Sequence, residues 1–189
     1  TNNIIVQNLT DNALTFGPGT GDITFTADSD NSGAGSIIFS DFSDTVVAPG
    51  RSLNFSGRSL FVSDISTVSP DGGGDVTLQS ATTILARDIN TYSLRSDGSG
   101  GGEVTIAAGS NISARFIRSD SPISTAGNLD IESESGNITI QNIIVNNNDN
   151  VDIAAPGNIS IQEMALSSFL ETLPAAHPAD ETTNPLNPL

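Results

Sequence analysis

The sequence predicts an all-β protein built as a parallel β-helix, a solenoid of stacked coils, with a short helix and an extended tail at its C-terminal end. Short runs of alternating apolar and polar residues, bounded by Gly, Asn, Asp and Ser, have the two-residue period of β-strands. These runs recur in the same order along the chain, and no segment before residue 164 has the length and spacing of a helix. The pattern is typical of coils made from short strands.

The first strand of each coil is the segment that repeats most clearly. Its four copies are residues 75–80 (DVTLQS), 103–108 (EVTIAA), 128–133 (NLDIES) and 150–155 (NVDIAA). The leading apolar residues, Val76, Val104, Leu129 and Val151, are 28, 25 and 22 residues apart. We expect these strands to stack, with Val104, Ile106, Leu129 and Ile131 pointing inward.

The second strand follows at a similar spacing, in residues 82–89 (TTILARDI), 110–117 (SNISARFI), 136–143 (GNITIQNI) and 157–164 (GNISIQEM). A third motif appears as LRSD at 94–97 and IRSD at 117–120. The N-terminal third is looser, although residues 21–28 (GDITFTAD) match the first series and short alternating runs continue to residue 64. About seven coils fit before residue 163 at this spacing.

A β-sandwich is the rival architecture, because hairpin turns could join the same strands. A sandwich gives no reason for consecutive units of this length to resemble one another. In a parallel β-helix each position stacks on its equivalent about 4.8 Å away, so like residues form continuous columns. We therefore assign residues 1–163 to a β-helical shaft.

Residues 164–189 depart from this pattern. Leu166, Phe169, Leu170 and Leu173 have the spacing of one apolar helix face, and Pro174 ends the segment. We expect this short helix to cover the open end of the solenoid, or to reach a neighbouring molecule as an arm. The remaining residues are rich in Pro and polar side chains and predict a flexible tail. This tail holds the only histidine, His177, which has no partners for a catalytic triad or a metal site.

Composition disfavours several classes of partner. The chain holds 22 Asp and Glu residues against 6 basic residues, all Arg, and its formal charge of −16 disfavours nucleic acid and anionic membranes. Without Cys there is no disulfide, thiolate metal site or Cys nucleophile, and no apolar run is long enough to insert into a membrane. Because the chain starts at Thr1 without a signal peptide, we expect a processed product or a piece of a longer protein.

The repeat units resemble the repeat region of filamentous-haemagglutinin-like exoproteins, particularly those of cyanobacteria. The units concerned include residues 72–93 (GGGDVTLQSATTILARDINTYS) and 127–143 (GNLDIESESGNITIQNI), and the resemblance covers about residues 3 to 163. It implies a right-handed parallel β-helix that is secreted by the two-partner system. It also implies an extracellular role in adhesion, surface structure or filament building. The N-P-N motifs of that family's secretion domain do not stand at the start of this chain, so the resemblance is to the shaft.

One loop carries a calcium-like pattern. Asp28, Asp30, Ser32 and Gly33 take the first, third, fifth and sixth places of a calcium loop, but Phe39 stands where the bidentate Glu belongs. A turn that uses Asp for its local hydrogen bonds is the alternative. We expect no other metal site and no cofactor.

The arginines fall at repeated positions. Arg87 and Arg115 follow Ala in two copies of the second strand, while Arg95 and Arg118 stand in the two RSD motifs. We expect salt-bridge ladders on the outer surface, balanced by Asp88, Asp97 and Asp120, because stacked like charges need partners. A stripe that binds anionic glycans is the alternative. The sequons that begin at Asn111, Asn137 and Asn158 belong to the repeat, which explains them better than glycosylation does.

These observations favour an extracellular structural or adhesive module, secreted and located at the cell surface. Its expected partners are other copies of the chain, joined head-to-tail into a filament, or the remainder of a larger exoprotein. A solenoid that binds cell-surface glycans or ions is the alternative. A polysaccharide-cleaving enzyme is less well supported, because hydrolysis needs two carboxylates at a defined separation and the only strong bases available are arginines. We therefore expect no enzymatic activity.

Overall fold

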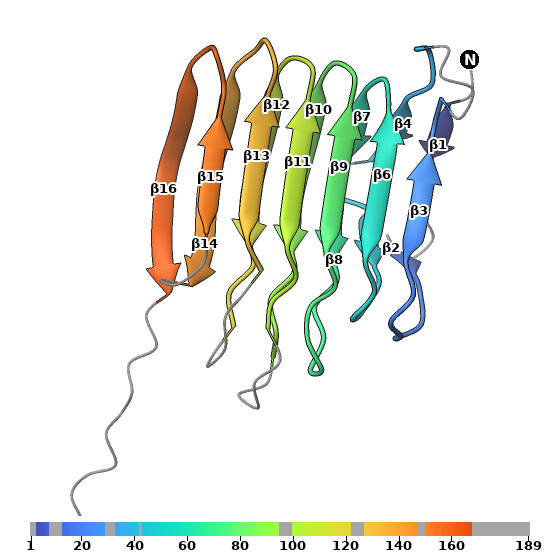
Figure 1. Cartoon of the computed structure of the whole chain (residues 1–189). Helices are drawn as coiled ribbons and strands as arrows, with labels where there is room; N and C mark the ends of the chain where they lie inside the picture. Colours follow the sequence, from blue (N-terminus) through green and yellow to red (C-terminus); the bar gives the residue numbers. More distant parts are fainter. Residues whose placement is uncertain are drawn as a thin grey trace, which may run out of the picture.

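The computed structural model describes residues 3–7, 13–28, 33–41, 43–94, 100–121, 127–146 and 150–167. These residues form two parallel sheets and contain no helix. Figure 1 shows the strands of successive coils lying side by side along one axis, with the two sheets facing each other. The prediction of a parallel β-helix is confirmed.

Sheet B takes one strand from each coil and follows the first repeat. Its strands are β3 (Ile23–Thr26), β6 (Leu53–Gly57), β9 (Val76–Ser80), β11 (Val104–Ala108), β13 (Leu129–Ser133) and β15 (Val151–Ala154). In Figure 1 they run in order from blue β3 to orange β15. Val104 pairs with Val76 on one side and with Leu129 on the other, so the repeats stack in the register that the sequence predicts.

Sheet A has two arms. The first arm stacks β1 (Ile4–Val6), β4 (Ile37–Phe39), β7 (Leu60–Val62), β10 (Ile84–Asn90), β12 (Ile112–Arg118), β14 (Ile138–Asn146) and β16 (Ile159–Ser167). The second arm starts as the separate strands β2 (Ala13–Thr15), β5 (Thr45–Val47) and β8 (Asp64–Ser66). Strand β10 spans both arms, because its first half pairs with β7 and its second half pairs with β8.

A corner joins the two arms where two consecutive residues face outward. The ladder between β10 and β12 pairs Ala86 with Ala114 and Asp88 with Phe116, and it skips Arg87 and the equivalent Arg115. The ladders of β14 with its neighbours skip Gln141 in the same way. Because the extra outward residue shifts the alternation by one, the apolar residues before and after the corner both face the core.

The core consists of apolar columns that run through the stack. Ile37, Leu60, Ile84, Ile112 and Ile138 form one such column, and each is at most 1% exposed. The rings of Phe25 and Phe55 stack with centroids 4.7 Å apart and begin another column. The four residues predicted to point inward, Val104, Ile106, Leu129 and Ile131, are buried as expected. Each buried side chain of this size contributes about 1.5–3 kcal/mol, so the columns stabilise the coil stack.

Asparagine side chains link the coils at the starts of strands. The backbone N–H of Asn137 donates to Oδ1 of Asn111 at 2.9 Å, and that of Asn158 donates to Oδ1 of Asn137 at 2.7 Å. The N–H of Asn150 makes the same contact with Asn128 in sheet B. The side-chain Oδ1 of each Asn accepts the backbone N–H of the equivalent Asn in the next coil, and this is why the N-I-[ST] triplets recur.

The glycines before the sheet B strands permit a close backbone approach between coils. A Cβ atom on Gly102 would lie 2.2 Å from the carbonyl oxygen of Gly74, and one on Gly74 would lie 2.2 Å from that of Arg51. Real Cβ atoms do not approach other atoms so closely. The repeated glycine runs of the sequence are therefore a packing requirement of the stack.

The C-terminal end differs from the prediction. Strand β16 continues to Ser167 through pairs such as Val145 with Leu166, so the boundary at residue 163 falls inside a strand. Leu166 lies in this strand and not in a helix, because pairing with β14 extends past the point where the helical spacing begins. Phe169, Leu170, Leu173 and His177 lie outside the described residues.

Candidate functional site

The corner between the two arms of sheet A gathers charged residues from successive coils. Arg87 and Arg115 occupy equivalent positions, as the sequence predicts. Each reaches back one coil to an acid: Nε of Arg87 lies 3.4 Å from Oδ1 of Asp64, and Arg115 makes two hydrogen bonds to Asp88. Both arginines therefore form ion pairs with acids of the preceding coil at the corner where the sequence predicts a ladder, although the partner of Arg87 is Asp64 and not one of the acids expected from the sequence.

Burial and neighbouring charges perturb the groups of this corner. Burial raises the pKa of Asp64, and the charge of Asp88 raises it further, while Arg87 and Arg115 oppose the shift. The side-chain hydrogen bond to Asp88 raises the pKa of Arg115. Asp41 behaves differently, because the backbone N–H and the hydroxyl of Ser43 hydrogen-bond its carboxylate and lower its pKa.

Three further residues belong to this corner that the repeats did not bring to attention: Asp44, Ser63 and Asp64. A signal for two of them exists, since residues 63–69 (SDISTVS) repeat as residues 87–93 (RDINTYS) one coil later. The register confirms that alignment by pairing Ile65 with Ile89. Asp44 has no such signal, because an Asp before an apolar run also marks an ordinary turn.

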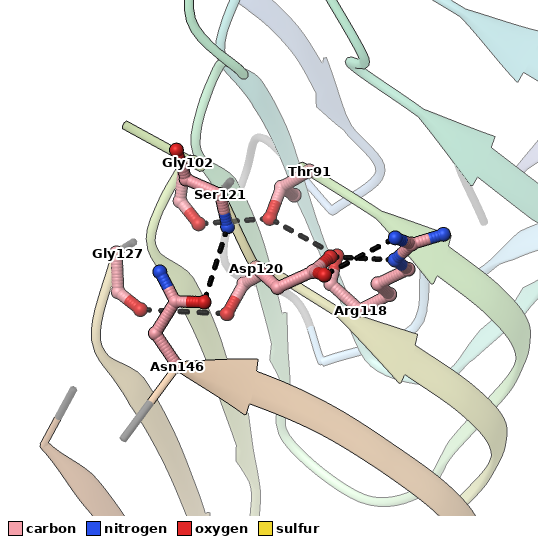
Figure 2. Close-up of polar contacts among 8 residues, drawn as sticks. Thr91, Gly102, Arg118, Asp120, Ser121, Gly127 and Asn146 are labelled. Carbon is pink, nitrogen blue, oxygen red and sulfur yellow. Dashed lines mark hydrogen bonds and ion pairs between the residues drawn. The ribbon is translucent and has the colours of Figure 1, made fainter. Parts of the chain in front are cut away.

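A second polar cluster lies at the end of sheet A, and Figure 2 shows part of it around Thr91 and Asp120. The hydroxyl of Thr91 donates to the carbonyl oxygen of Gly102 at 2.8 Å, and that of Ser119 donates to the carbonyl oxygen of Gly127 at 3.4 Å. One coil earlier Thr67 makes the same contact with Gly74 at 2.6 Å. These buried hydroxyls tie the end of one strand to the start of the next, so their role is structural.

Arg118 belongs to this second cluster. Its guanidinium donates to both carboxylate oxygens of Asp120, at 2.5 and 3.1 Å, and lies 4.0 Å from the ring centroid of Tyr92 (Figure 2 shows the contact with Asp120). The hydrogen bond to Asp120 raises the pKa of Arg118. This arginine is therefore held by an acid of its own coil and by an aromatic ring of the preceding coil.

The predicted equivalence of Arg95 and Arg118 is wrong. Arg118 pairs with Asn90 in one neighbouring coil and with Ile144 in the other. The register is set by the apolar pair Ile89 and Ile117, and burial of these two residues outweighs the similarity of the two RSD motifs. Arg95 and Asp97 themselves lie outside the described residues.

The calcium-like loop is only partly described. Oδ2 of Asp28 accepts the N–H of Gly33 at 2.8 Å. This is the local hydrogen bond expected if the loop is an Asp-containing turn and not a calcium loop. Asp28 also has a positive φ of 76°, a conformation that Asp tolerates in turns. Asp30 and Ser32 lie outside the described residues.

The hollows on the outer surface of the described residues include two open ones. One, of about 520 Å³, borders the ends of the sheet B strands, and the ionisable side chains that line it are Asp28 and Glu134. The other, of about 330 Å³, lies on the first arm of sheet A between Leu85, Arg87 and Arg115. Its two arginines are those already paired with Asp64 and Asp88.

Within the described ranges no helix is long and apolar enough to cross a membrane. In the same part of the chain no group of three or more His, Cys, Asp or Glu side chains is placed to hold a metal ion. Comparison of the chain with protein-family models, with curated proteins and with solved structures gave no match.

Proposed function

We propose that this chain is a structural module of an extracellular β-helical exoprotein, with a non-catalytic role as a shaft or an adhesive surface. The observation that carries the proposal is the continuity of the apolar columns from coil to coil. Such a stack provides length and stiffness with few residues per coil. The resemblance of the repeats to filamentous-haemagglutinin-like exoproteins supports an extracellular location and two-partner secretion.

The outer face of sheet B suits a module that is exposed to solvent. One outward column of sheet B is polar or acidic throughout: Thr24, Asn54, Thr77, Thr105, Asp130 and Asp152. The net charge of −16 favours the solubility of such a strand-rich surface. A flat surface of hydroxyl, amide and carboxylate groups can bind partners by hydrogen bonds without a deep pocket.

The edges of the described stack support a partner with the same repeat. Val151 and Ile153 on β15 occupy the columns that begin with Ile23 and Phe25 on β3, and all four are only partly buried. A further coil with this pattern would therefore continue the columns at either edge. That coil can belong to a longer parent chain or to a second copy joined head-to-tail. Cell-surface glycans are less favoured, because Arg87, Arg115 and Arg118 are already paired with acids.

Surface labelling of cells that produce the protein tests the extracellular role. An antibody raised against the folded chain should label intact cells, and permeabilisation should not increase the signal. A cytoplasmic protein of the same cells, labelled only after permeabilisation, is the control. Labelling that requires permeabilisation would rule out the extracellular assignment.

A further inference from the structure

Four buried side-chain oxygens without a hydrogen-bond partner gather at one corner of the described structure. They are Oδ1 and Oδ2 of Asp44, Oγ of Ser63 and Oδ1 of Asp64. Asp44 is 0% exposed and Ser63 is 1% exposed. Buried polar atoms are normally paired, so a concentration of exceptions at one place calls for a ligand.

The register places these residues against one another in two adjacent coils. Asp44 directly precedes Thr45, which pairs with Asp64, and Ser63 directly precedes Asp64. The backbone N–H of Asp64 donates to the carbonyl oxygen of Asp44 at 3.2 Å. Asp44 and Ser63 thus occupy the same position of successive coils, at the interstrand spacing of about 4.8 Å.

The local charges do not balance. Asp41, Asp44, Asp64 and Asp88 supply four negative charges, and Arg87 and Arg115 supply two positive charges. Arg115 is engaged by Asp88, and Arg87 lies 3.4 Å from Asp64. The carboxylate of Asp41 is held by Ser43. Within the described residues neither carboxylate oxygen of Asp44 has a hydrogen bond, and a buried carboxyl group left without hydrogen bonds is costly to the fold.

We propose that this corner binds a hard divalent cation, with Asp44, Ser63 and Asp64 as its side-chain ligands. The oxygens of Asp44 and Ser63 have no hydrogen bond, and Oδ1 of Asp64, which Nε of Arg87 approaches to 3.4 Å, is the third side-chain ligand. An all-oxygen set of carboxylate and hydroxyl groups suits hard cations such as Ca²⁺ and Mg²⁺ better than softer metals, which favour nitrogen or sulfur ligands. Two carboxylates and one hydroxyl are fewer side-chain ligands than a closed site needs, so backbone carbonyls and water complete the shell. Flexible coordination of this kind suits Ca²⁺ better than Mg²⁺. The cation balances the two excess negative charges of the corner.

Calcium titration of the full chain tests this site. Protein freed of divalent ions with EDTA is titrated with CaCl₂ by calorimetry, and its thermal unfolding is followed by circular dichroism. We expect one saturable site above the weak binding of surface acids, and a rise in Tm on saturation, because the cation binds only the folded state. Parallel titration with MgCl₂ should give weaker binding.

Two variants and a matched control make the outcome decisive. Asp44→Asn should lose both the saturable site and the calcium-dependent rise in Tm, and without metal it should unfold at a higher temperature than the wild type. Ser63→Ala, which keeps every charge, should weaken binding. Asp130→Asn removes one exposed acid from sheet B and should leave the site intact. Absence of a saturable site in the wild type, or unchanged binding by Asp44→Asn, would overturn the proposal.

Discussion

At the scale of single residues, Gly102 shows most clearly how a repeat position is fixed by packing. Its backbone lies so close to Gly74 of the preceding coil that an added Cβ would meet a carbonyl oxygen at 2.2 Å. Gly102→Ala should therefore displace one coil from the next and destabilise the fold by about 3 kcal/mol, which lowers Tm by about 6 to 12 °C. Gly17→Ala is the matched control, because no atom lies within 4 Å of its added Cβ. Equal Tm values for the two variants, measured by circular dichroism, would contradict the close approach.

At the scale of strands, the alternation of buried and exposed residues decides the effect of a charge. Leu78 on β9 is fully buried, while its neighbour Thr77 faces outward between Asn54 and Thr105. Leu78→Asp should leave the protein unfolded at 25 °C, with no cooperative thermal transition. The reason is that an unpaired buried carboxylate costs several kcal/mol, a large part of a total free energy of unfolding of about 5–15 kcal/mol. Thr77→Asp adds the same charge to the same strand and should change stability by about 0.5 kcal/mol or less. A folded Leu78→Asp variant would mean that the register of sheet B is wrong.

The strands also show what the sequence could and could not predict. The sheet B register followed directly from the repeats, because apolar columns repeat position by position and one face of each strand must be buried. The pairing of Arg118 was misjudged because a short polar motif, RSD, carries less burial energy than the apolar residues beside it. The end of β16 was misplaced because Leu166 fits both an apolar helix face and a strand, and only the neighbouring strand β14 decides between them.

The site was less predictable than the fold for a related reason. Arg87 and Arg115 could be aligned because they follow the repeat, and their outward position was expected. Asp44 could not be recognised, because its burial depends on a loop and on residues of the next coil that the local sequence does not reveal. A single Asp in a turn has the same local pattern whether it is solvated or buried.

At the scale of the whole molecule, the two edges of the stack match each other. Ile5, Ile159 and Met164 are three of the four large apolar side chains that are strongly exposed in the described residues, and all three lie on edge strands. The same apolar columns run from one edge to the other, so in a head-to-tail pair the columns of one copy would continue those of the next. The outward acid Asp152 would meet Thr24 of a second copy, so continuation brings no like charges together in that column. Edge strands with free backbone groups and apolar side chains favour association.

Substitution at the edge of β16 tests the proposed head-to-tail association. Ile159→Glu places a charge at the β16 end of the apolar column that contains Ile138. It should raise the dissociation constant of self-association, measured by sedimentation velocity, about tenfold, which corresponds to about 1.4 kcal/mol. Leu94→Glu is the matched control, since Leu94 is also exposed but lies away from both edges. Deletion of residues 168–189 leaves β16 whole and distinguishes the possible roles of the tail. If the tail is an arm that joins molecules, the deletion should abolish association, and if the tail covers its own edge, the deletion should strengthen it. Equal association by the Ile159→Glu and Leu94→Glu variants would show that the β16 edge is not the contact.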